Sequence, residues 1–100
     1  MKDSEKYQVY SILNSKGCFW SYAQKNQIPD DESLIEKALI YLDFEDMHLL
    51  FAAFNVRRIK KVWRNNLVSQ NQYYSVLNFL LAVFVFKVKN PHGYIKRYSI

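Results

Sequence analysis

Apolar residues recur at helical spacing through most of the chain that follows Pro29, and few helix-breaking residues interrupt them. The first two stripes are Leu34, Ile35, Ala38, Leu39 and Leu42, then Met47, Leu50, Phe51 and Phe54. Residues three and four apart share one face of an α-helix, so each stripe predicts an amphipathic helix. The sequence has only two Gly and two Pro, too few for the many turns of a β-sandwich or barrel. We therefore predict an all-α fold, a compact bundle of about four to six helices in one domain spanning residues 1–100.

Polar residues and glycine indicate where the first helices begin and end. The segment Asp3–Asn14 predicts a short helix that stops at Gly17, with a strand as the alternative because its apolar spacing fits a helix only in part. The acidic run 30–32 marks the start of a second helix, since the free amides at a helix N-terminus favour negative charge. We expect Asp43 to cap the next helix. Asn55, in a left-handed conformation, is expected to end that helix and to start the one after it.

The fifth predicted helix, Gln70–Phe86, follows a capping-box spacing at Ser69 and Gln72. It is apolar on two faces: one stripe comprises Tyr73, Leu77, Leu80, Leu81 and Phe84, and the other Val76, Phe79, Val83 and Phe86. A second copy of the chain would cover the second stripe in a symmetric homodimer, which we predict. The alternative cover is the segment Tyr7–Leu13 with an aromatic cluster of Phe19, Trp20 and Tyr22. A last short helix is expected after Asn90 and Pro91, with Tyr94, Ile95 and Tyr98 facing inward.

The fourth predicted helix, Val56–Val68, carries the strongest functional signal. Its apolar side comprises Val56, Ile59, Val62, Trp63 and Leu67, and its basic side Arg57, Arg58, Lys60, Lys61 and Arg64, followed by Asn65. Burying five cations together would leave them with too few acids to pair, so we expect the basic face to be exposed and the Trp63 face to be buried. The basic face is predicted to dock on an acidic partner protein. The alternative is a solvated surface whose charges pair with Glu36 or Glu45.

The helix at residues 43–54, the turn at Asn55 and the basic helix also resemble a helix-turn-helix pair. In that motif the second helix enters the major groove of DNA and reads bases with Arg, Asn or Gln side chains. The readers would be Arg57, Arg58, Lys61, Arg64 and Asn65. A DNA-binding transcriptional regulator is therefore the alternative function, although helix pairs with short turns occur in any helical bundle.

Charge is distributed unevenly along the chain. All nine acidic residues lie in the first 46 positions, whereas residues 51–100 contain nine basic residues and no acidic one. This asymmetry predicts a surface that attracts anions. The apolar run Val76–Phe86 is shorter than the roughly 20 residues that cross a bilayer, so no membrane association is expected. The lone Cys18 and the charged N-terminal segment without an apolar core favour a cytoplasmic protein.

The residue inventory argues against an enzyme. The sequence has no Gly-rich phosphate loop, and Cys18 has only Lys16 as a charged neighbour, whereas a nucleophile needs a base. Glu45 and His48 match the Glu-x-x-His spacing of di-iron bundles, but those sites need two such motifs. We therefore expect no catalytic residue, no cofactor and no metal.

Four stretches of the chain, FWSY, IPDDESLIEKALIYLDFEDMHLLF, RRIKKVWRNNLVSQNQYYSVLN and KNPHGYIKRY, resemble a family of small proteins from Bacteroides-type bacteria. Members of that family are similar to the small partners found beside abortive-infection nucleotidyltransferase toxins. The resemblance covers about 80 residues and leaves residues 1–18 outside it as an N-terminal extension. It implies a non-enzymatic, antitoxin-like or accessory role with a nucleotidyltransferase-type toxin as the partner.

Overall fold

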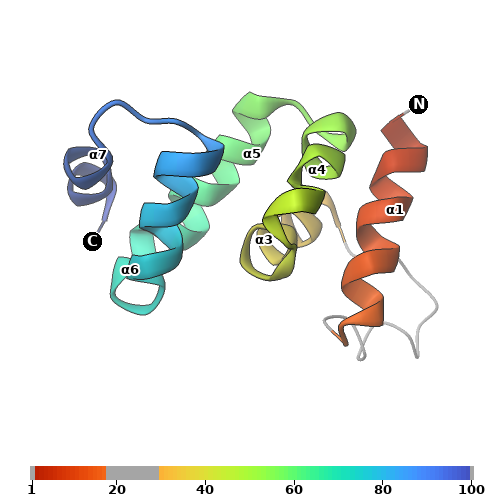
Figure 1. Ribbon diagram of the computed structural model, residues 1–100. Helices are drawn as coiled ribbons and strands as arrows, with labels where there is room; N and C mark the ends of the chain where they lie inside the picture. The colour runs from red at the N-terminus through yellow and green to blue at the C-terminus, as the bar shows by residue number, and fades with distance from the viewer. Residues whose placement is uncertain (1, 18–29, 100) are drawn as a thin grey trace. The chain divides into compact units, whose positions relative to one another are not determined.

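The computed structural model describes residues 2–17 and 30–99, and every regular element in these ranges is helical (Figure 1). The prediction of an all-α fold is therefore confirmed. The chain divides into two compact units, Met1–Ile59 and Lys60–Ile100. None of the described helices has the length and apolar character needed to cross a bilayer. Cys18 and the aromatic residues Phe19, Trp20 and Tyr22 lie outside the described residues.

The first unit is built from α1 (Lys2–Ser15), α3 (Asp31–Tyr41) and α4 (Met47–Ala53), with a 3-10 turn η1 (Phe44–Asp46) before α4. The three α-helices contact one another. Their facing sides form a core of fully or almost fully buried residues: Val9, Leu13, Leu34, Ile35, Ala38, Leu39, Met47, Leu50 and Ala53. The helix predicted at 3–14 is confirmed over its strand alternative, and Gly17 follows it with a φ of 82°.

The helix starts of this unit are where the acidic residues predict them, but the side chains do not cap. Asp30 and Asp43 occupy N-cap positions in extended backbone, and neither carboxylate accepts a cap hydrogen bond. Asn55 does cap: its Oδ1 accepts a 2.8 Å hydrogen bond from the Arg58 amide at the start of α5 (Val56–Val62). The left-handed conformation predicted for Asn55 is wrong, because α4 ends through the extended backbone of Phe54 instead, with φ −133° and ψ 154°.

Asp31 carries the ion pairs of the first unit that connect α1 and α5 to α3. Its two oxygens lie 2.6 Å from Lys6 Nζ and 3.0 Å from Arg58 Nη1. The hydrogen bond from Lys6, with the charges of Lys6 and Arg58, lowers the pKa of the Asp31 carboxyl below its usual value. Arg58 is therefore paired with an acid of its own unit; the alternative of a solvated basic face had placed such pairs at Glu36, Glu45 or their neighbours.

Because of this lowered pKa, the stability of the protein depends on pH. In the unfolded chain an Asp carboxyl has a pKa of about 3.9. The contribution of Asp31 to the free energy of unfolding is therefore fully present above that pH, and it is lost as the pH falls through the lower pKa of the folded state. We expect Asp31→Asn to reduce the free energy of unfolding by less than about 1 kcal/mol near neutrality, since the pair is partly exposed. Urea melts of both proteins at about pH 6 and about pH 2 measure this. The difference should be smaller at the lower pH; an equal difference at both would show that the ion pairs do not stabilise the fold.

The second unit begins within α5 and continues through irregular turns. A π-helical turn η2 (Trp63–Leu67) and a 3-10 turn η3 (Val68–Gln70) lead into α6 (Asn71–Leu80), which is followed by a second π-helical turn η4 (Leu81–Val85) and by α7 (Pro91–Tyr98). The predicted capping box is wrong. Ser69 Oγ donates to the Asn65 carbonyl at 2.6 Å, because the preceding turns leave that carbonyl within reach, and Gln70 occupies the N-cap position without a side-chain hydrogen bond.

The last helix begins as predicted. Asn90 Oδ1 accepts a hydrogen bond of 3.2 Å from the Gly93 amide, and Pro91 takes the first helical position. A Cβ atom at Gly93 would lie only 2.5 Å from the side-chain nitrogen of Asn90, so any larger residue there would have to displace the capping side chain. Of the three residues expected to face inward, Ile95 is buried and the two tyrosines are half-buried.

The apolar surface of α6 and η4 is only partly covered. Leu81 and Ala82 are buried, whereas Tyr73, Val76 and Phe84 are exposed, with 73%, 72% and 61% of their surface accessible. In the first unit, α1 packs against α3 and α4. The exposed residues come from both predicted stripes, and the homodimer that would cover the second stripe stays a prediction.

Candidate anion-binding surface

Trp63 forms the centre of the second unit. Its indole is completely buried and lies between two rings, Phe86 with centroids 4.5 Å apart and Tyr94 with centroids 5.4 Å apart and nearly parallel. Ile59, Val62 and Leu67 are buried as predicted for the apolar side of the basic helix. Val56 is the exception, with 54% of its surface exposed, because it is the first residue of α5 and directly follows the Asn55 cap.

The only buried polar side chain among the described residues is Asn78, and it binds the Trp63 indole. Trp63 Nε1 donates to Asn78 Oδ1 at 3.1 Å. Asn78 Nδ2 in turn donates to the Leu67 carbonyl at 3.0 Å and to Asn71 Oδ1 at 2.9 Å. Every polar atom of this amide is thus satisfied, and the position of Trp63 is fixed by both stacking and hydrogen bonding.

Three cations surround the tyrosines that extend this stack. Lys60 Nζ lies 5.3 Å from the centre of the Tyr94 ring, and the guanidinium groups of Arg64 and Arg97 lie 5.1 and 5.5 Å from the centre of the Tyr98 ring. The two tyrosine rings are themselves 4.8 Å apart. These are distances at which a cation is attracted to the face of an aromatic ring. We call Lys60, Arg64, Tyr94, Arg97 and Tyr98 the cation–tyrosine cluster.

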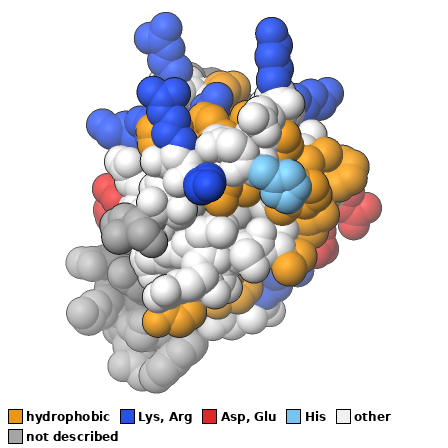
Figure 2. Space-filling model, turned by 90° about the vertical axis from the view of Figure 1, so that its left-hand side faces the viewer, with side chains coloured by type: hydrophobic (Ala, Val, Ile, Leu, Met, Phe, Trp, Pro, Cys, Tyr) orange, Lys and Arg blue, Asp and Glu red, His pale blue; other side chains and the backbone are white. Residues whose placement is uncertain are grey.

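No acidic side chain can neutralise this cluster from within its unit. Residues 60–100 contain seven basic residues and no Asp or Glu, since Asp46 is the last acid of the chain. Like charges gathered without counter-charges raise the local positive potential and attract anions. Figure 2 shows Lys and Arg side chains gathered along one edge of the face that it views.

A hollow of about 340 Å³ opens beside the cluster on one side of α7. Its lining consists of Val88, Lys89, Asn90, Gly93, Tyr94 and Arg97. Two of these residues belong to the cation–tyrosine cluster, and Lys89 adds a further exposed cation. The hollow therefore offers an anion a partly enclosed contact with positively charged side chains.

The structure divides the six residues predicted to bind a partner. Arg57 and Arg58 belong to the first unit, and the other four to the second. Arg57, Lys61 and Asn65 are exposed, whereas Lys60 and Arg64 are half-buried against the tyrosines. The sequence pattern missed Arg97, Tyr94 and Tyr98 as members of the same cluster.

The helix pair expected to resemble a helix-turn-helix is α4 and α5, joined by Phe54 and Asn55. The regular part of α5 is seven residues long before the π-helical turn begins. Two of the predicted base readers already contact other side chains of the chain: Arg58 pairs with Asp31, and Arg64 lies over Tyr98. Base reading would require these side chains to leave their present contacts.

An acidic group lies at the start of α4. Asp43, Glu45 and Asp46 can each place one carboxylate oxygen within 4.8 Å of the others. The His48 ring does not join them; its Nδ1 lies 2.9 Å from the backbone carbonyl of Glu45. Exposed acids at a helix start are explained by the helix dipole, and the prediction that the protein holds no metal stays a prediction.

Comparisons of the chain with protein-family models, with curated proteins and with solved structures give no match. The resemblance to partners of abortive-infection toxins therefore stays a prediction, and the functional argument rests on the geometry of the second unit.

Proposed function

We propose that this chain is a non-enzymatic accessory protein that binds an acidic partner protein through the cation–tyrosine cluster of its second unit. One observation carries the proposal: three cationic groups lie on two adjacent tyrosine rings, in a unit that has seven basic residues and no acidic one. Because its own unit supplies no acidic side chain, the cluster keeps a positive potential that attracts an acidic partner.

Stacking on the tyrosine ring orients the arginine side chains so that they can bind carboxylates. A guanidinium that rests on a ring loses less side-chain freedom on binding, and it still offers its N–H groups at the edge of its plane. A carboxylate accepts two parallel hydrogen bonds from such a group. Arg64 and Arg97 approach the same Tyr98 ring from different helical segments, so together they favour an acidic surface with more than one carboxylate. The resemblance suggests a nucleotidyltransferase-type toxin as this partner.

The proposal predicts that partner capture depends on the cluster and not on net charge. Arg64→Glu with Arg97→Glu should reduce recovery of the partner by at least about tenfold, because each truncated charge pair costs roughly 1–3 kcal/mol. The matched control is Lys87→Glu with Lys96→Glu, which makes the same charge change in the same unit at residues outside the cluster and outside the hollow beside it. Affinity purification of each tagged chain from the native host, with quantitative mass spectrometry, measures the recovery.

Equal loss in both double variants would mean that only the total charge matters, and unchanged recovery in the Arg64/Arg97 variant would contradict the proposed surface. The DNA-binding alternative is tested with the same three proteins. A labelled duplex titrated over a range of salt concentrations should bind weakly, whereas a regulator would bind tightly at low salt and lose affinity steeply as salt rises.

A further inference from the structure

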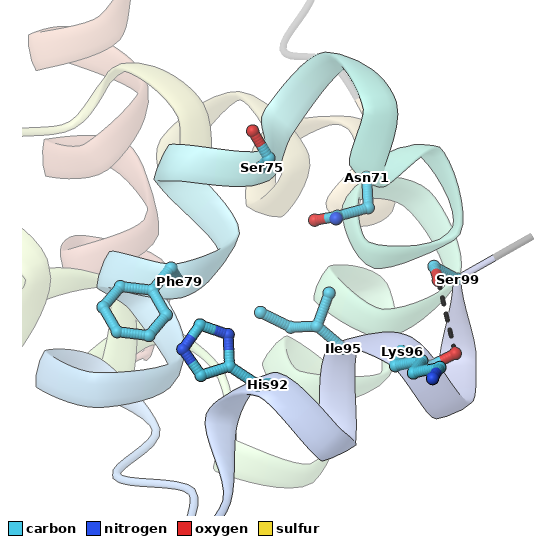
Figure 3. A pocket seen from close by; sticks show the side chains of 7 residues that line it. All are labelled: Asn71, Ser75, Phe79, His92, Ile95, Lys96 and Ser99. Atoms are coloured by element: carbon cyan, nitrogen blue, oxygen red, sulfur yellow. Dashed lines mark hydrogen bonds between the residues drawn. The ribbon is translucent and has the colours of Figure 1, made fainter.

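The other side of α7 forms a second hollow of about 350 Å³ with α6 (Figure 3). Its lining from α6 is Asn71, Ser75 and Phe79, and its lining from α7 and the residue after it is His92, Ile95, Lys96 and Ser99. Residues four apart share a helix face, so each helix presents one row of side chains to the hollow. The volume falls in the range of about 300–1,000 Å³ that is typical of small-molecule sites.

The polar groups of this hollow are hydrogen-bond donors. The Asn71 side chain accepts from buried Asn78 through its Oδ1, so its NH₂ group is the part left for a ligand. The Ser75 hydroxyl, a His92 ring nitrogen and the Lys96 ammonium add further donors from both helices. No carboxylate side chain of this unit competes with them, since residues 60–100 contain no Asp or Glu. The lining therefore offers several hydrogen-bond donors and one positive charge but no negative charge, which favours an oxyanion.

The Ser99 hydroxyl donates to the Lys96 carbonyl at 3.3 Å, and the rest of the lining, Phe79 and Ile95, is apolar and suits a short hydrocarbon or aromatic group. Figure 3 shows the Phe79 and His92 rings next to each other, with Ile95 beside them. The two ring centres are 4.9 Å apart with planes inclined by 30°, and Ile95 is almost fully buried. An apolar group on the ligand would cover the exposed part of Phe79 and displace water from it.

We propose that the hollow between α6 and α7 binds a small organic oxyanion, a carboxylate or a phosphate monoester joined to an apolar group. The oxyanion lies among Asn71, Ser75 and Lys96, and the apolar group lies on Phe79 and Ile95. The site goes beyond the proposed partner contact, because it uses the Ile95 and Lys96 side of α7 and not the cation–tyrosine cluster.

Titration of the full-length, ¹⁵N-labelled protein tests this site by NMR. The probes are benzoate, phenyl phosphate, the neutral isostere benzamide, and inorganic phosphate. At least one of the two aromatic anions should produce saturable shifts of the Ser75, His92 and Lys96 resonances, and the preferred one identifies the head group. Benzamide and inorganic phosphate should each bind at least about tenfold more weakly. Benzamide binding as tightly as the anions would overturn the proposal, as would the absence of any saturable shift up to about 10 mM probe.

The variant Lys96→Gln removes the charge that the oxyanion faces while keeping a side chain of similar length. The affinity for the preferred anion should fall by about three- to tenfold, a modest change because Lys96 is exposed. The control Lys87→Gln removes an equal charge outside the hollow and should leave the affinity unchanged. Equal affinities for the wild type, Lys96→Gln and Lys87→Gln would overturn the assignment of the anion to this site. If a variant fails to fold, the titration of the wild-type protein still shows whether the hollow binds the anion.

Discussion

Replacement of Trp63 by alanine should lower the free energy of unfolding by about 3–5 kcal/mol, a large part of the total stability of a domain this small. The indole is completely buried, stacks on Phe86 and Tyr94, and donates to Asn78. Its removal leaves a cavity at the centre of the second unit and also ends the stack that positions the cation–tyrosine cluster. Urea melts followed by far-UV circular dichroism measure the change.

Trp63→Phe is the matched control, since it retains a ring for stacking but loses the indole N–H. It should cost less than the alanine change, and the cation–tyrosine cluster should persist. A shift of the alanine variant below about 1 kcal/mol would place Trp63 at the surface and contradict the packing of this unit.

Replacement of Asn78 by leucine should lower the free energy of unfolding by about 2–4 kcal/mol, although it makes the core more apolar. The substitution leaves the buried Trp63 Nε1 and the Leu67 carbonyl without their partner, and each unsatisfied buried group costs roughly 1–3 kcal/mol. A double-mutant cycle with Trp63→Phe isolates the hydrogen bond. The two changes should be non-additive by about 0.5–3 kcal/mol; simple additivity would show that the Trp63–Asn78 bond contributes nothing.

Helix positions and the burial of Trp63 could be predicted because both follow from local periodicity. The stripes after Pro29 identify α3 and α4, and the alternation of Ile59, Val62 and Trp63 with cations indicates which side of α5 and η2 is buried. The acidic run before α3 marked the correct helix start even though its carboxylates do not cap. Local charge preference and apolar spacing are sufficient for such features.

The role of Asn78 could not be predicted from local sequence patterns. In the sequence it only interrupts the apolar run Val76–Phe86. In the structure it is the partner of a tryptophan 15 residues earlier. No periodic signal specifies a hydrogen bond across two segments, because it depends on the packing of α6 against η2 and η3. The capping box predicted at Ser69 was wrong for a related reason. The π-helical turn before Ser69 places the Asn65 carbonyl within reach of its hydroxyl.

The cation–tyrosine cluster was only half visible in the sequence. Lys60 and Arg64 stood out as part of a basic helix face, and Tyr94 and Tyr98 were expected to face inward as packing residues. Their meeting requires α7 to pack onto the turns after α5, which no spacing within either segment predicts. Two of the cations assigned to an open face therefore rest on rings of another helix.

The binding claim is tested most directly by NMR with the captured acidic partner added to the full-length, isotope-labelled chain. The side-chain Nε resonances of Arg64 and Arg97 and the amide of Tyr98 should shift or broaden as the partner is added. The amides of α1 and α3 should remain unchanged. Perturbations confined to the first unit, with the arginine resonances unmoved, would show that the partner does not bind at the cation–tyrosine cluster.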